Sequence, residues 1–198
     1  MAGATGGDGP DVAPQAPPAS ALERDAEEWV ADYVNVRHLL RTRDWLAALA
    51  PEAGEALRVA ALTHDIERRV PGGPRMDARR AGGQDAAYLH EHARRSARIV
   101  DAWLAERGAG RELRASVFEL VLRHETGGTP AADLVQAADS LSFLEVNAGR
   151  ARAWVDEGRC DLAEAQAKLD WMRDRIRVPA AAAAAAALHA RALVALAA

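Results

Sequence analysis

The sequence predicts an all-α protein with a single compact domain, and three observations lead to this prediction. Apolar residues in the middle of the chain recur at intervals of three and four, which is the period of an amphipathic helix. No segment shows the strict alternation of a half-buried strand. The length of 198 residues is enough for one domain with tails at its two ends.

Helix start and stop signals give the individual elements. Capping boxes begin at Ser20 and at Asp161, where a Glu follows three residues later. Thr129 precedes Pro130, which is the order of an N-cap followed by a proline in the first turn. The expected helices are 21–33, 34–49, 52–67, 84–107, 111–124, 130–147 and 161–177, with a short candidate helix at 148–157.

The two ends of the chain differ in composition from the middle. Residues 1–19 contain mainly Gly, Pro, Ala and Asp, which cannot bury enough surface to offset the entropy of ordering, so they predict a disordered tail. The compact domain is expected at 20–178. Residues 179–198 are mostly alanine, which favours helix but offers little surface to bury, so they predict a partly helical tail outside the core.

The stretch 70–83 is the one long irregular segment expected inside the domain. It contains four of the glycines and two of the prolines, and it lacks an apolar period. Loops of this length in compact domains are usually functional or disordered. It directly follows the adjacent pair His64-Asp65, which favours a functional role.

Charge and cysteine content narrow the function classes. The net charge of -4 gives no general attraction to nucleic acid or to an anionic membrane. The arginines alternate with acidic residues, so no nucleic-acid surface is expected. Cys160 is the only cysteine, which excludes an internal disulfide and a CxxC zinc site. No secretory signal and no uncharged apolar run of about 20 residues is present, which favours a cytoplasmic location without membrane contact.

Several potential metal ligands lie on the apolar faces of the expected helices. Asp139 lies between Val135 and Phe143, each four residues away, and an aspartate there is costly to bury unless it is paired or ligating. A single histidine on an apolar face is more often a satisfied core residue. The simultaneous presence of several such residues instead predicts a metal site, and the histidines in question are His38, His64, His92 and His124.

His90 and His92 compete for one of these positions. Two residues on a helix are about 200° apart, so both side chains cannot face the same centre. His92 shares its face with Ile99 and Trp103, whereas His90 shares its face with Arg94. The sequence therefore predicts that His92 faces inward and that His90 lies at the surface or at the rim of the site.

The order of these residues, His … His-Asp … His … His … Asp, resembles the HD-domain superfamily of metal-dependent phosphohydrolases. The resemblance covers about residues 34–147 and implies an all-α HD-type domain. In that family the first His, the His-Asp pair and the last Asp bind one metal, and two further histidines help to bind a second. The resemblance therefore implies the metal ligands His38, His64, Asp65, His92, His124 and Asp139.

The ligand types and the resemblance together suggest a chemistry. Imidazoles with carboxylates suit Mn, Fe, Co, Ni or Zn better than Mg or Ca, so one or two divalent transition metal ions are expected. The resemblance implies hydrolysis of a nucleotide or another small phosphate ester or anhydride through a metal-activated water, with Asp65 shared between two metals. The segment His124–Gly128 is similar to the His-Thr-Thr-Gly stretch of bacterial dinucleoside tetraphosphate hydrolases of this superfamily.

Arg68 is the second expected catalytic residue. Many relatives read His-Asp-Ile-Gly-Lys, and here the run is His64-Asp65-Ile66-Glu67-Arg68. Arg68 is a candidate to replace the lysine as a phosphate contact, and arginine is the better bidentate partner. The other interpretation is that Arg68 is a solvated residue at a helix end.

Two other functions remain open at this point. One is a non-catalytic HD module that binds a nucleotide or a partner protein. The other is an oxygenase with a di-iron centre, because a few HD proteins of that kind resemble this ligand set. The sequence gives neither the substrate nor the oligomeric state.

Overall fold

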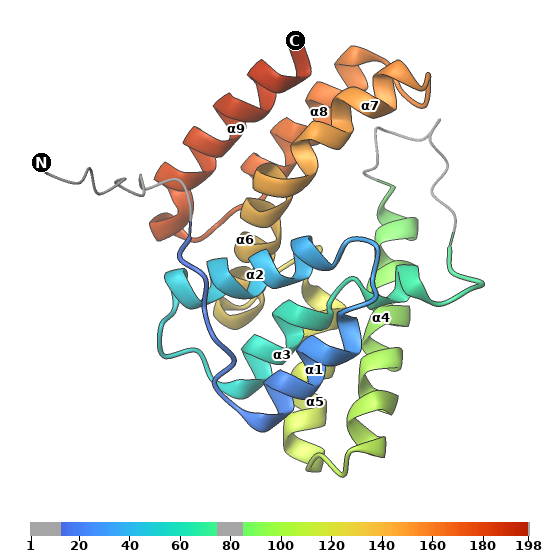
Figure 1. The fold of residues 1–198 in the computed structure, drawn as a ribbon, viewed down its shortest axis with the longest axis vertical. Helices are drawn as coiled ribbons and strands as arrows, with labels where there is room; N and C mark the ends of the chain where they lie inside the picture. Colours follow the sequence, from blue (N-terminus) through green and yellow to red (C-terminus); the bar gives the residue numbers. More distant parts are fainter. Residues whose placement is uncertain (1–12, 75–84, 198) are drawn as a thin grey trace, which may run out of the picture.

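The computed structural model describes residues 13–74 and 85–197, and within these ranges it contains helices and no strand (Figure 1). The predicted all-α fold is confirmed. The α-helices are α1 (Ala21–Val30), α2 (Val36–Leu49), α3 (Glu55–Thr63), α4 (Ala86–Glu106), α5 (Arg111–Arg123), α6 (Pro130–Ser142), α7 (Ala148–Asp156), α8 (Leu162–Asp174) and α9 (Ala182–Ala197). Shorter helical turns are η1 (Ile66–Arg69), η3 (Phe143–Asn147) and η4 (Pro179–Ala181).

The predicted capping signals operate in the structure. The Ser20 side chain accepts a hydrogen bond from the Glu23 amide at 3.1 Å, and Thr129 caps α6 in the same way. Both halves of the capping box at Asp161 are formed, because the Glu164 carboxylate also accepts from the Asp161 amide at 2.8 Å. These bonds satisfy amides that have no partner within the helix.

Two of the expected helices are interrupted, and both interruptions lie beside the predicted ligands. The expected helix 52–67 ends as α-helix at Thr63 and continues as the 3-10 turn η1. The expected helix 130–147 ends as α-helix at Ser142 and continues as the π-helical turn η3. The candidate helix at 148–157 is present as α7.

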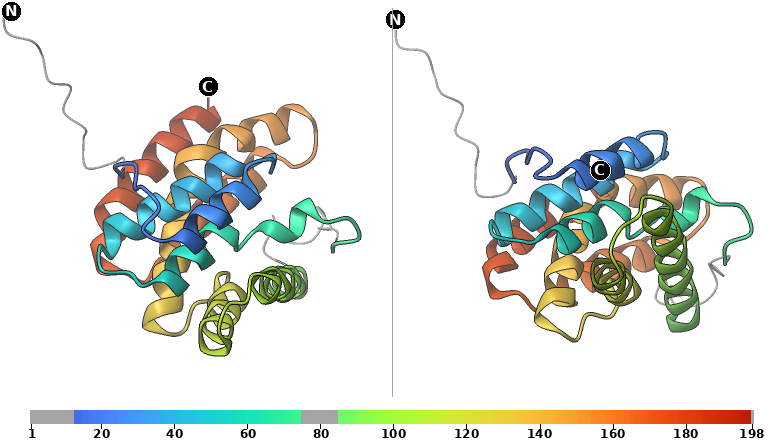
Figure 2. Two further views of the ribbon diagram at one scale, coloured as in Figure 1. Left: turned by 60° about the horizontal axis from the view of Figure 1, so that its bottom comes forward. Right: turned by 90° about the horizontal axis from the view of Figure 1, so that it is seen from below.

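Two hydrophobic cores hold the helices together. The first contains residues of α6, α7, α8 and α9, and the last three of these helices gather at one end of the molecule (Figure 1). The second contains residues of α1, α3, α4 and α5, and Figure 2 shows α4 and α5 side by side. Helices α2, α3 and α6 contribute side chains to both cores. Consequently the predicted ligands on these three helices lie where the two cores meet.

The C-terminal segment is part of the fold, so the prediction of a tail outside the core is wrong for residues 179–197. Leu188, Ala192 and Leu196 are buried in the first core, where α9 packs against α7 and α8. The alanines of α9 are small enough to let it approach α7 and α8 closely. The small and large apolar residues of α9 together form a continuous buried face. Pro179–Ala197 is the described helix that meets the length and mean hydropathy, 1.6, of a membrane span. A partly buried core helix also meets them, and α9 carries Arg191.

The N-terminal prediction also needs correction where the chain is described. Ala13 is buried, and its carbonyl accepts a hydrogen bond from Arg41 at 2.8 Å. The Ala16 amide donates to Asp44 at 3.0 Å. Residues 13–19 therefore lie against α2 through backbone bonds, which their composition does not reveal. Residues 1–12 of the predicted tail lie outside the described residues.

The predicted functional loop 70–83 is described only to residue 74. Within that part, the Pro71 carbonyl accepts a hydrogen bond from Arg95 at 2.6 Å. Gly73 lies directly on Glu67, since a Cβ there would be 1.6 Å from the Glu67 Oε1. A side chain at residue 73 would therefore displace the Glu67 carboxylate.

If α9 belongs to the core, Leu188→Ala should lower the free energy of unfolding by about 2–5 kcal/mol, because it leaves a cavity among α7, α8 and α9. Val194→Ala is the matched control on the same helix, since Val194 is 73% exposed, and its effect should stay within about 0.5 kcal/mol. Urea unfolding followed by circular dichroism measures both. Equal effects of the two variants would contradict the packing of α9.

Candidate metal centre

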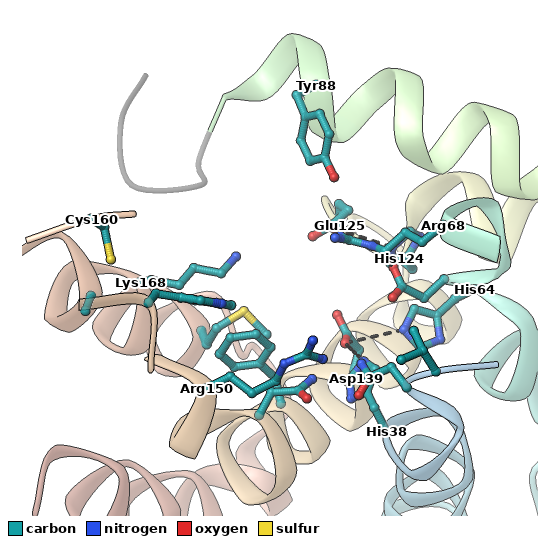
Figure 3. Close-up of a pocket in the computed structure, with 18 of the residues that line it drawn as sticks. His38, His64, Arg68, Tyr88, His124, Glu125, Asp139, Arg150, Cys160 and Lys168 are labelled. Atoms are coloured by element: carbon teal, nitrogen blue, oxygen red, sulfur yellow. Dashed lines mark hydrogen bonds and ion pairs between the residues drawn. The ribbon is translucent and has the colours of Figure 1, made fainter. Parts of the chain in front are cut away.

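The first group of ligands comes from α2, α6 and the end of α3. The packing of α2 on α6 places His38 opposite Asp139, with the His38 Nε2 3.1 Å from the Asp139 Oδ1. His64 follows the last residue of α3 and points its Nε2 at the same oxygen, at 3.4 Å. All three side chains are buried and converge at one point of the cavity wall (Figure 3).

The second group comes from α4 and the end of α5. His92, His124 and Glu125 each offer a ligand atom, and these atoms lie within 4.8 Å of one another. The Asp65 Oδ1 lies 3.0 Å from the His92 Nε2, so Asp65 adjoins this group. The two groups are neighbours, because the rings of His64 and His124 have their centroids 5.0 Å apart.

Helix ends fix the orientation of two of the imidazoles. The last backbone carbonyls of a helix have no partner within it. The His64 Nδ1 lies 3.0 Å from the Ala61 carbonyl, and the His124 Nδ1 lies 2.7 Å from the Val121 carbonyl. A carbonyl only accepts, so each Nδ1 carries the proton and each Nε2 keeps its electron pair.

Side chains fix the other two imidazoles. The Ser142 hydroxyl donates to the His38 carbonyl at 2.7 Å, so its oxygen accepts from the His38 Nδ1 at 2.9 Å. The His92 Nδ1 lies 2.8 Å from the Glu67 Oε2, a carboxylate–histidine pair of the kind that orients metal ligands. All four imidazoles therefore turn Nε2 inward, and in the neutral ring this nitrogen carries the free electron pair.

This donor set fits a divalent transition metal. The buried Nε2 atoms of His64 and His92 have no hydrogen-bond partner among the described residues. Each faces a carboxylate oxygen, and two acceptors face each other stably only with a cation or a proton between them. Burial lowers the pKa of His92, but the facing carboxylate of Asp65 and the hydrogen bond to Glu67 outweigh this and raise it to about 9. A metal must therefore displace a proton here, so binding should weaken as the pH falls.

Arginines hold the buried carboxylates in their charged form. Arg175, directly after α8, forms hydrogen bonds with both Asp139 and Glu125 and so joins the two ligand groups. Burial alone would raise the pKa of Asp139, but the charge of Arg175 and the facing imidazoles of His38 and His64 hold it well below its usual value. An ionised carboxylate is the form that binds a metal.

Asp65 is held from two sides. Its Oδ1 accepts from the Arg68 Nε at 2.7 Å, and its Oδ2 accepts from the Tyr33 hydroxyl at 2.9 Å. Burial favours the neutral acid, yet the charge of Arg68 and the facing imidazole of His92 keep the pKa of Asp65 well below its usual value. The α-helix ends at Thr63, and the two residues that follow have different partners: His64 faces Asp139, and Asp65 faces His92.

The site opens into a cavity of about 380 Å³. Tyr88 lies above it and Arg68 beside it (Figure 3). The Tyr88 ring is nearly parallel to that of His92, with the centroids 6.0 Å apart. Small-molecule sites usually have volumes of roughly 300–1,000 Å³, so a compact ligand fits.

The structure brings together all six predicted ligands and leaves His90 exposed on the outer face of α4. Their binding of metal remains a prediction. The sequence patterns did not single out Glu125, which follows His124, or Glu67, which lies two residues after Asp65. They also missed Tyr33 and Arg175, which reach the site through tertiary packing and have no local signal.

Comparison with known families agrees with this geometry. A family model described as HD domain matches residues 35–144, which is more than half of the chain. The chain belongs to the HD-domain family. The matched segment contains all six predicted ligands and Arg68, whereas α7, α8 and α9 of this HD-domain protein lie beyond it. No curated protein and no solved structure gives a significant match.

His92→Ala should lower the number of metal ions bound per chain, because it removes a buried inward Nε2 from the second ligand group. His90→Ala, two residues away and exposed, should leave it unchanged. Elemental analysis of both proteins, purified without chelator, makes the comparison. The reverse ranking would mean that α4 is rotated about its axis.

Glu67→Ala should weaken metal binding about 10- to 100-fold without removing a ligand, because the carboxylate that orients His92 is lost. Glu91→Ala is the control, since Glu91 lies on α4, has its side chain 44% exposed and pairs with Arg94 among the described residues. Competition with a chromophoric chelator gives both affinities. An unchanged affinity in Glu67→Ala would refute the orienting role.

Proposed function

We propose that this protein is a metal-dependent phosphohydrolase that acts on a nucleotide or another small phosphate ester or anhydride. The observation that carries the proposal is the convergence of four inward imidazole Nε2 atoms and two ionised aspartates beside a ligand-sized cavity. Membership of the HD-domain family supports it.

The residues that would hold metal fall into the two groups described above, with Asp65 between the imidazoles of His64 and His92. A bound metal would supply a Lewis acid that polarises the phosphate and lowers the pKa of a water. Two groups of ligands in one cavity are consistent with one or two ions, and the imidazole-rich set favours Mn, Fe, Co, Ni or Zn.

Arg68 is the candidate phosphate contact among the protein's own groups. Its Nε is bonded to Asp65, which leaves the two terminal nitrogens of the guanidinium for a substrate oxygen. Its side chain is 40% exposed and lines the cavity, so a phosphate can approach it. A planar guanidinium anchored through Nε offers both remaining nitrogens in a fixed plane, which suits a phosphate.

Tyr33 and Tyr88 have different tasks. Tyr33 donates to Asp65 and, together with Arg68, fixes the plane of that carboxylate. Tyr88 lies one helical turn before His92, and its hydroxyl points toward the cavity (Figure 3). Burial, reinforced by nearby carboxylates, raises the pKa of Tyr88, so it stays neutral and can donate a hydrogen bond to an anionic substrate.

The proposal predicts bound transition metal and phosphate release from at least one member of a panel of nucleotides and phosphate esters. Asp65→Ala should abolish both, because it removes a carboxylate that adjoins both imidazole groups. Asp156→Ala, at an exposed position of α7, should leave both unchanged.

Other outcomes separate the alternatives. Bound iron with oxygen-dependent turnover would indicate an oxygenase. Nucleotide binding by metal-loaded protein without any turnover would indicate a non-catalytic module. Absence of metal, with no activity after addition of Mn, Co or Fe, would refute the metalloenzyme.

A further inference from the structure

The cavity has a second wall that the metal site does not use. It is formed by α7, α8 and the turn between them, which lie beyond the segment matched by the HD-domain model. Among the described residues, the basic side chains that line it are Lys168, Arg150 and Arg159. In Figure 3, Lys168 extends into the open space from the side opposite His64 and Arg68.

Lys168 is half-buried on α8, and its ammonium group lies against two aromatic rings. The ammonium nitrogen lies 4.1 Å from the centroid of the Trp171 ring and 5.4 Å from that of Phe143. Within residues 13–74 and 85–197, no carboxylate forms an ion pair with it. Burial lowers its pKa to about 8, as expected for a cation that lacks a close counter-charge. The aromatic faces attract the ammonium but do not neutralise it.

The acidic residues of the cavity are already engaged elsewhere. Asp139 and Glu125 bond to Arg175, and Asp65 bonds to Arg68. Glu164, the acid on α8, accepts the Asp161 amide in the capping box. Arg159 pairs with Glu157 at 3.5 Å, whereas Lys168 and Arg150 form no ion pair with the described residues. The charge of these two side chains can therefore attract an anion into the cavity.

The turn η3 shapes the floor between the two walls. A π-helical turn widens the helix, and here it follows directly after the α6 segment that carries Asp139. Phe143 and Asn147 both line the cavity from this turn, and Trp154 of α7 lines it beyond them. Such turns are frequent at functional sites. The floor is thus part apolar and part polar, and it connects the metal ligands with Lys168.

We propose that Lys168, assisted by Arg150, binds a second anionic group of the substrate, on the other side of the cavity from Arg68. The substrate class is then a small molecule with two phosphate-type groups, one at the metal ligands and one at α8. The position of the reacting phosphate rests on the proposed function, whereas the anion site on α8 is tested by binding alone.

The test compares methylphosphonate with a series of alkyl bisphosphonates of increasing length, none of which can be hydrolysed. Isothermal titration calorimetry on the metal-loaded protein gives each dissociation constant. The best bisphosphonate should bind about 10- to 100-fold more tightly than methylphosphonate, the gain expected for one charge-assisted hydrogen bond. Lys168→Met should remove this gain, and Lys168→Arg should keep most of it.

Arg152→Gln is the matched control, because Arg152 lies on α7 but bonds to Asp156 and to the Leu196 carbonyl instead of lining the cavity. It should keep the full gain. Arg150→Glu, at an exposed position, should reduce the gain because it reverses a charge beside the anion site. It also provides the test if Lys168→Met does not fold. Circular dichroism and metal analysis verify that each variant is folded and loaded.

Two results would overturn the proposal. One is that no bisphosphonate binds more tightly than methylphosphonate. The other is that the gain survives in Lys168→Met and in Arg150→Glu, which would mean that both phosphonates bind the metals. The binding test does not depend on phosphate release. If the protein shows no hydrolase activity but still shows a Lys168-dependent gain in affinity, the proposed function is refuted and the anion site is retained.

Discussion

The protein buries four imidazole Nε2 atoms that point toward one region, and this arrangement constrains the rest of the structure. A buried polar atom without a partner costs about 1–3 kcal/mol. Two such atoms are the Nε2 atoms of His64 and His92. The first faces the ionised carboxylate of Asp139, and the second faces that of Asp65. Only a cation or protons at this point satisfy so many acceptors, so the fold is built to hold positive charge there.

The outer ends of the imidazoles show how the fold keeps this arrangement. His64 and His124 occupy the same position relative to their helices, one residue past the last helical residue, and each bonds a carbonyl of the final turn. The carbonyl at the helix end therefore gains a hydrogen-bond donor from the imidazole, and this bond determines that Nδ1 carries the proton. His92 depends instead on Glu67, against which Gly73 packs so closely that no side chain fits.

The C-terminal helices complete the site although they lie outside the family match. Arg175 follows α8 and bonds to Asp139 and Glu125, one from each ligand group. Its position depends on α8, which packs on α9 through a continuous buried face. The alanine-rich helix therefore supports the metal centre from a distance, and α8 also carries the lysine that faces the cavity from the other side.

Sequence patterns predicted the features that are local. Helix periodicity and capping residues gave most helices, and the apolar faces separated His92 from His90 correctly. The patterns failed where tertiary packing decides. Alanine composition did not reveal that α9 is buried, because burial depends on what α9 packs against. Arg175 carried no signal, since its role arises only when the end of α8 meets α6.

The central claim is that the inward imidazoles and carboxylates bind a transition metal, and X-ray absorption spectroscopy of protein purified without chelator tests it most directly. The account predicts imidazole nitrogen and carboxylate oxygen ligands at about 2.0–2.2 Å for a metal such as zinc. It predicts further that the imidazole contribution falls in His92→Ala and not in His90→Ala. A spectrum with oxygen ligands only, or the same spectrum in both variants, would contradict the account.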